Sequence, residues 1–157
     1  MFELKKLSFG GPAAIVTSMG LIVGLDTATA TKAAVVGGLL IIGLADNLTD
    51  SLSVHIYQES ERLAERQAFR TTVANYFSRL TVTVSFVFLF ALLPSTAAIA
   101  TCLAWGLFLL CGLSYLLAKE RQVSAAGEIL KHVGVAFAVI AISKVLGLFI
   151  GDFSGVA

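Results

Sequence analysis

The residues best suited to chemistry lie in one apolar stretch, where Asp46, Asp50 and His55 interrupt a long run of hydrophobic side chains. Ionisable groups inside a membrane are costly because hydrocarbon offers no water to solvate them, so they pair or serve a function. Carboxylate oxygens suit hard divalent cations such as Mg²⁺ and Mn²⁺, and an added imidazole also suits Fe²⁺. A carboxylate that is neutral when empty and charged when a cation binds also provides a basis for cation/proton exchange.

Helical geometry separates these groups into two faces. A turn of about 100° per residue places Asp50 within about 60° of the line through Asp46. Asn47 and His55 lie on a second polar line, roughly 130° away. His55 can therefore join the aspartates only in a site shared with another helix or subunit. The predicted site consists of the candidate metal ligands Asp46, Asp50 and His55, with a secondary polar lining of Asn47, Thr49 and Ser53.

Structural roles are the alternative for the same residues. The amide and hydroxyl side chains can act as hydrogen-bonding contacts between membrane helices. Lys144 is a possible partner for the aspartates, but it lies closer to the outer end of its segment than they do. We expect Lys144 to extend toward the interface or to pair with Asp26.

Composition identifies the class of protein that must position these groups. The 157 residues are 57% hydrophobic and only 13% charged, whereas soluble domains are roughly 25% charged. A net charge of +1 gives no electrostatic case for nucleic acid. Cys102 and Cys111 fit neither a disulfide framework nor a metal-binding spacing. No nucleophile–base pairing and no cofactor motif is found, so we expect neither an enzyme nor a bound cofactor.

The fold class predicted is all-α, an integral membrane protein with five transmembrane helices in a single domain, 1–157. The predicted spans cover residues 11–30, 33–57, 76–93, 97–117 and 129–150. The second helix contains no breaker and is expected to extend into the cytoplasm over 58–75, with Glu59 and Glu61 as acidic access residues. Two small-residue motifs, Gly20-x-x-x-Gly24 and Gly147-x-x-x-Gly151, predict close helix packing. For the first motif we favour packing within the chain over dimerisation.

Basic residues predict the orientation of these spans. One side carries nine lysines and arginines: Lys5, Lys6, Arg62, Arg66, Arg70, Arg79, Lys119, Arg121 and Lys131. The other side carries Lys32, with Lys144 inside the membrane. Cytoplasmic loops are enriched in such residues. We therefore expect a multi-pass protein of the inner or cell membrane, with a cytoplasmic N-terminus and an external C-terminus.

The second segment also resembles a known family. Gly43-Leu-Ala-Asp46 followed by Ser53-Val-His-Ile-Tyr-Gln-Glu59 resembles the second-helix motif of the vacuolar iron transporter family. The stretch Ile15-Val-Thr-Ser-Met-Gly-Leu-Ile-Val-Gly24-Leu25 looks like the first helix of that family. The resemblance implies a homodimer of five-helix subunits that exports Fe²⁺ or Mn²⁺ from the cytosol against protons.

The resemblance carries over only in part. The family's second-helix glutamate falls on Asp46, which keeps the carboxylate. Its first-helix Asp-Gly pair falls on Ala13-Ala14, and its methionine ligand falls on Val54. The metal-binding domain between helices two and three is reduced to 58–75, and Asp50 is additional. Transport of Fe²⁺ or Mn²⁺ is the predicted function. Transport of another small solute on the same scaffold and a structural or assembly role are the alternatives.

Overall fold

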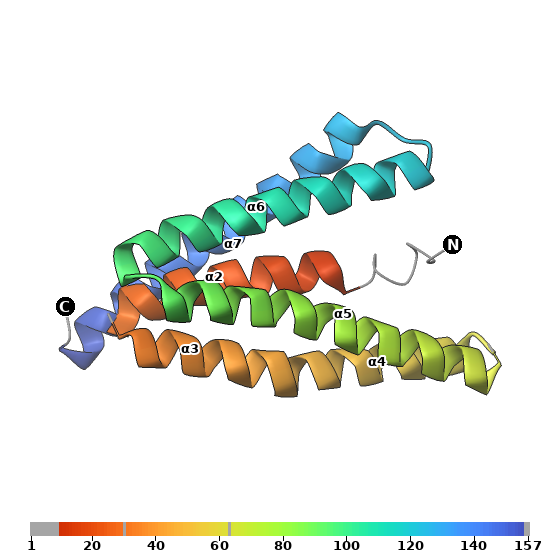
Figure 1. The fold of residues 1–157 in the computed structure, drawn as a ribbon, viewed down its shortest axis with the longest axis horizontal. Helices are drawn as coiled ribbons and strands as arrows, with labels where there is room; N and C mark the ends of the chain where they lie inside the picture. The colour runs from red at the N-terminus through yellow and green to blue at the C-terminus, as the bar shows by residue number, and fades with distance from the viewer. Residues whose placement is uncertain (1–9, 30, 63, 156–157) are drawn as a thin grey trace.

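The chain folds entirely into helices joined by short turns. The computed structural model describes residues 10–29, 31–62 and 64–155 (Figure 1). Its helices are α2 (Gly11–Thr29), α3 (Lys32–Ile41), η1 (Ile42–Asp46), α4 (Asn47–Ser60), α5 (Glu65–Leu92), α6 (Ser95–Glu120) and α7 (Ala125–Ser154). The segments α3, η1 and α4 form one continuous helix in which η1 is a single π-helical turn. Five helices within these ranges are long and apolar enough to cross a membrane, which confirms the predicted fold class and a multi-pass membrane protein.

Several helix ends follow directly from the sequence. Pro12 lies in the first turn of α2, where its missing N–H costs no hydrogen bond. Pro94 lies directly before the first residue of α6, where it also interrupts no hydrogen bond of the helix. The Ser124 side chain caps α7 by accepting a hydrogen bond from the Gly127 N–H. Gly155 ends α7 with a φ of 67°, a left-handed conformation that glycine adopts readily.

Helix α2 lies at the centre of the bundle. It packs against α3, α5, α6 and α7, and it is the most buried of the five spans. The α4/α5 and α6/α7 hairpins diverge toward the end of the molecule at which α2 begins (Figure 1). At the opposite end, the Lys32 ammonium donates to the Leu93 carbonyl at 2.9 Å, so the start of α3 and the end of α5 lie level.

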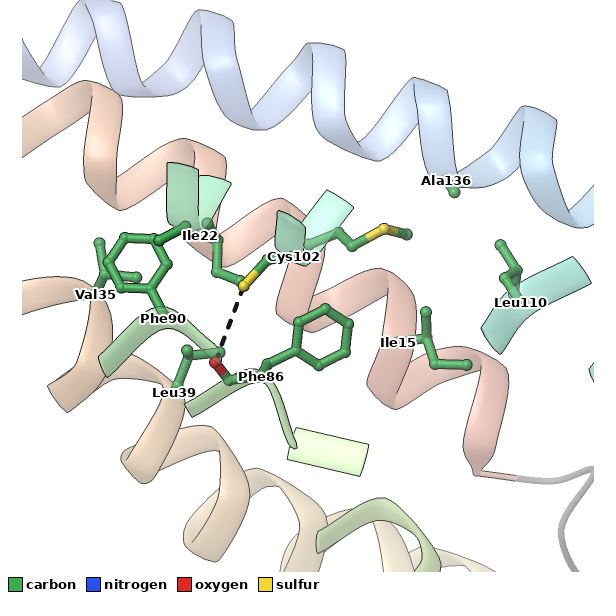
Figure 2. Packing of buried hydrophobic residues seen from close by; sticks show 11 residues of the cluster. Ile15, Ile22, Val35, Leu39, Phe86, Phe90, Cys102, Leu110 and Ala136 are labelled. Atoms are coloured by element: carbon green, nitrogen blue, oxygen red, sulfur yellow. Dashed lines mark hydrogen bonds between the residues drawn. The ribbon is translucent and has the colours of Figure 1, made fainter. Parts of the chain in front are cut away.

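The apolar core gathers around α2 (Figure 2). Ile15 and Ile22 of α2 face Phe86 and Phe90 of α5, and all four are at most 1% exposed. Cys102 of α6 joins this cluster with its thiol 4.0 Å from the Phe86 carbonyl. Burial of such side chains fixes the helices around α2, while α4 and α7 carry large exposed apolar side chains suited to lipid.

The two glycine motifs pack against each other between α2 and α7. A Cβ added at Gly147 would lie 2.6 Å from the Gly24 carbonyl oxygen. One added at Gly20 would lie 2.8 Å from Val139, and one added at Gly151 would lie 3.5 Å from the Thr27 carbonyl oxygen. The small residues therefore allow the backbones of these helices to approach closely. Both motifs serve packing within the chain, as favoured for the first of them.

The second helix does not continue over 58–75 as predicted, because the chain reverses within this range. Helix α4 ends at Ser60, the chain turns, and α5 already begins at Glu65. The third span is therefore longer than the predicted 76–93. Arg62 adopts a φ of 58° in this turn. Charge pairs spaced along a helix contribute only about 0.2–0.5 kcal/mol each. Packing α5 back along α4, with Ala68 and Thr71 buried, outweighs that preference for one continuous helix.

Of the two alternatives predicted for Lys144, the structure does not have the ion pair with Asp26 in its described residues. Lys144 is exposed on α7 and Asp26 is partly buried on α2. No ion pair between them occurs in the described structure. The reason is geometric, because Gly20 and Gly24 face α7 while Asp26 lies roughly 200° around the helix from Gly24.

Candidate functional site

The two aspartates lie where the π-helical turn meets α4. Asp46 is the last residue of η1, and Asp50 lies in the first turn of α4. Asp46 is about 20 Å along the helix from Lys32, and Arg79 of α5 is about 20 Å from Leu92. Since these two helix ends lie level, Asp46 and Arg79 are at the same depth. A hydrocarbon core is roughly 30 Å thick. With Lys32 and Leu92 at one edge of this core, Asp46 and Arg79 lie inside it.

Arg79 is the centre of the site, and its side chain is only 3% exposed. Its Nη1 lies 2.6 Å from Asp50 Oδ2, and its Nη2 lies 3.3 Å from Asp46 Oδ2. Its Nε donates to Asn47 Oδ1 at 2.9 Å, and Nη1 also donates to the Gly10 carbonyl at 3.4 Å. The guanidinium thus joins the start of α2 to both polar faces of the second span.

Arg79 was predicted to lie with the basic residues on the cytoplasmic side, and this prediction is wrong. Arg79 is instead buried inside the bundle. A signal for this was present, because Asn75, Arg79 and Thr83 repeat at four-residue spacing on α5 and all three are buried. This spacing puts them on one face of the helix. They form a polar row facing α4, and the predicted span 76–93 contained Arg79 and Thr83 but not Asn75.

The charges at this site do not cancel. Two carboxylates and one guanidinium leave one formal negative charge. The side chains of Asp46 and Asp50 are 52% and 46% exposed, whereas Arg79 is buried. A buried cation requires paired acceptors, because removing one partner of a buried pair is strongly destabilising. The aspartates therefore neutralise Arg79 and retain exposed carboxylate surface on one side of α4.

Asn47 faces α5 and holds the guanidinium. Besides accepting from Arg79, its amide nitrogen donates to the Gly43 carbonyl at 3.2 Å and to the Thr83 hydroxyl at 3.4 Å. One turn further along, the Asn75 amide donates to the Ser51 hydroxyl at 3.2 Å. Asn47, predicted as polar lining, is thus a buried residue that positions Arg79.

Thr49 and Ser53 lie on the exposed face of α4 with the two carboxylates. Their hydroxyls donate to carbonyls of their own helix, at Ala45 and Thr49, with distances of 2.9 and 3.1 Å. These bonds satisfy the hydroxyl donors but leave oxygen lone pairs exposed. Asp46, Thr49, Asp50 and Ser53 therefore form a polar stripe on the exposed side of the second span, beside exposed leucine side chains.

His55 is separate from the aspartates, as the helical geometry predicts. Its Nδ1 lies 3.1 Å from the Thr72 hydroxyl, which itself donates to the Ala68 carbonyl at 2.9 Å. The tautomer of the ring decides which group of this pair donates the hydrogen bond. Nε2 faces Glu59, whose carboxylate oxygen is 3.5 Å away. His55 lies in an apolar groove between α4 and α5 that Leu52 and Phe69 help to line.

The predicted acidic access residues lie at the α4/α5 turn. Glu59 is exposed with its carboxylate beside His55 Nε2, and Glu61 is exposed in the turn itself. Glu61 is about 16 Å along the helix axis from Asp50. The predicted metal residues thus separate into the Asp46–Asp50 pair and His55. In the ranges the structure describes, no group of three His, Cys, Asp or Glu side chains is placed to hold a metal ion.

Comparison of the chain with models of known protein families, with curated proteins and with solved structures finds no match. The class defined by fold and site is a five-span α-helical membrane protein with an Asp–Arg–Asp cluster in its second and third spans. The likeness to vacuolar iron transporters stays a prediction from the sequence motifs.

Proposed function

We propose that this protein is a membrane transporter for a cation and that Asp46 and Asp50 form its cation-binding site. The observation that supports this most directly is the surplus negative charge at membrane depth. Both carboxylates pair with Arg79 through Oδ2 and are about half exposed. Retaining such groups in a membrane span is costly without a function.

The sequence resemblance suggests Fe²⁺ or Mn²⁺ as the cargo and proton-coupled export from the cytosol as the direction. Carboxylate oxygens are suitable ligands for Mn²⁺ and for Fe²⁺. A carboxylate can also take up a proton when the cation leaves, which couples the two movements. The surplus charge of the Asp46–Asp50–Arg79 cluster provides the site for this exchange.

We propose that the transporter works as a homodimer. The polar stripe on the second span, Asp46, Thr49, Asp50 and Ser53, is exposed in a single chain. Such a stripe is unfavourable against lipid and needs protein or water to cover it. A second copy that packs beside this stripe would enclose a polar path between two subunits, with both carboxylate pairs lining it.

The basic residues support a cytoplasmic N-terminus and an external C-terminus. Two single-cysteine additions test this orientation in sealed cells, Glu61→Cys in the α4/α5 turn and Ser95→Cys at the start of α6, which are both exposed. A membrane-impermeant maleimide should label Ser95→Cys from outside and Glu61→Cys only after lysis. The reverse pattern would contradict the proposed orientation.

Transport is tested with the purified chain in proteoliposomes that contain an Fe²⁺- or Mn²⁺-sensitive dye. We expect cation entry that depends on a proton gradient. Asp50→Asn and Asp46→Asn should each lower the initial rate by about tenfold or more, since a charge-assisted contact is worth about 1.5–3 kcal/mol. Leu48→Ala changes an exposed apolar residue of the same helix, so it is the control and should keep most of the rate. Absence of any cation flux from the wild type would refute the proposal.

A structural role is the second candidate, and the contacts of Arg79 favour it. One guanidinium connects Gly10 at the start of α2 with Asp46, Asn47 and Asp50 of the second span. A residue with this many partners can hold a bundle together without any transport. In that case, Asp46→Asn and Asp50→Asn would lower stability or weaken self-association, and no variant would affect cation flux.

A further inference from the structure

We propose that Arg79 is an internal competitor of the transported cation. In this view the guanidinium occupies the carboxylates when the site is empty, and it withdraws toward Asn75 when a cation binds. The inference rests on the proposed function, since it concerns the same aspartates. It assigns to Arg79 and Asn75 a control of affinity that neither the sequence motifs nor the transport proposal contains.

The contact distances carry the first step. Divalent cations bind carboxylate oxygens at about 2.0–2.6 Å. Arg79 Nη1 is already 2.6 Å from Asp50 Oδ2, and Nη2 is 3.3 Å from Asp46 Oδ2. A cation shared by these two oxygens would lie against the guanidinium, and two like charges at such a distance repel strongly away from bulk water. The guanidinium and a divalent cation therefore exclude each other from the Oδ2 atoms.

The second step is that Arg79 keeps partners when it leaves the carboxylates. Its Nε bond to Asn47 Oδ1 and its Nη1 bond to the Gly10 carbonyl involve neither aspartate. Both of these acceptors are on or next to elements that pack against α5. The guanidinium can therefore leave the carboxylates while it keeps hydrogen bonds to these two acceptors. Their dipoles then stabilise its positive charge while the cation occupies the carboxylates.

The third step is a vacant acceptor beside the arginine. Asn75 is fully buried, and among the residues that the structure describes its Oδ1 has no hydrogen-bond partner, while its amide nitrogen bonds Ser51. A Cβ added at Gly10 would contact both this Oδ1 and the Arg79 side-chain carbons Cγ and Cδ. The oxygen thus lies next to the stem of Arg79, one helical turn away on α5. An unpaired buried acceptor is costly, and a guanidinium N–H that has left the carboxylates would satisfy it.

Binding of Mn²⁺ to the purified full-length chain in detergent tests the competition without requiring transport. Free Mn²⁺ is measured by its paramagnetic resonance signal. Arg79→Gln removes the competitor and keeps a hydrogen-bond donor, so it should bind Mn²⁺ at least about tenfold more tightly than the wild type. Arg79→Lys keeps the positive charge beside the carboxylates and should bind Mn²⁺ more weakly than Arg79→Gln does. Binding by Arg79→Gln that is absent, or no tighter than in the wild type, would overturn the proposal.

A second pair of variants tests the withdrawn position and leaves Arg79 in place. Asn75→Leu removes the vacant acceptor and should weaken Mn²⁺ binding by about fivefold, the worth of one hydrogen bond. Ser51→Ala removes the same Asn75–Ser51 bond but keeps Oδ1, so it should bind as the wild type does. Equal effects of the two variants on Mn²⁺ binding would refute the withdrawal step. If Arg79→Gln does not fold, this pair of variants is the deciding test of the proposal. Failure of transport itself is seen separately, as wild-type proteoliposomes without cation flux.

Discussion

Gly147→Ala tests the packing that holds α7 to the centre of the bundle. The added Cβ would lie 2.6 Å from the Gly24 carbonyl oxygen and 2.8 Å from Thr27 Cβ. The first of these is a backbone atom, so it cannot rotate away, and α2 and α7 must separate. Overpacking of this kind costs about 1–3 kcal/mol. Gly134→Ala on the same helix is the matched control, because a Cβ there meets nothing within 4 Å.

The comparison cancels the general preference of helices for alanine, which is about 1 kcal/mol per residue and is shared by both variants. We therefore expect the free energy of unfolding of Gly147→Ala to be about 1–3 kcal/mol lower than that of Gly134→Ala. The measurement is reversible unfolding in mixed micelles with increasing SDS, followed by circular dichroism. Equal stabilities of the two variants would show that the glycine contact does not set the separation of α2 and α7.

Two further substitutions test local features of the fold. Arg62→Gly should stabilise the protein by up to about 1 kcal/mol, because Arg62 has a φ of 58° and glycine adopts this conformation without strain. Glu61→Gly in the same turn has no such strain to relieve and should not stabilise, so an equal gain would contradict the explanation. Trp105→Phe removes the 3.0 Å hydrogen bond to the Ser85 hydroxyl and should cost about 1 kcal/mol in the same unfolding assay. In a double-mutant cycle, Trp105→Phe should cost about 1 kcal/mol less once Ser85→Ala has removed the acceptor, and an additive result would exclude the bond as the cause.

Composition and charge distribution predicted the membrane class and the number of spans. The five apolar runs were separable because charges gather between them, and no soluble fold of this length hides so much apolar surface. The shared face of Asp46 and Asp50 was predictable as well. Residues downstream of Asp46 are regular α-helix, so the usual rotation per residue applies to them.

The partners of these aspartates were not predictable from the same reasoning. Arg79 was counted with the surface charges although the predicted span 76–93 contains it, because hydropathy and charge counts do not show which side chains of another helix lie beside a residue. The end of α4 at Ser60 was missed for a related reason. Helix-forming residues continue through 61–70, and only packing between α4 and α5 determines where the chain reverses.

The π-helical turn at Ile42–Asp46 has a consequence for how sequences of this kind are compared. Such a turn accommodates one residue more than an α-helix of the same rise, so it acts as an insertion hidden within an unbroken helix. Residues before it, such as Val35 and Leu39, follow one rotational register, and residues after it follow another. A gap-free alignment with a regular helix can therefore match the aspartates or the core positions of α3, but it misplaces the other set by one residue.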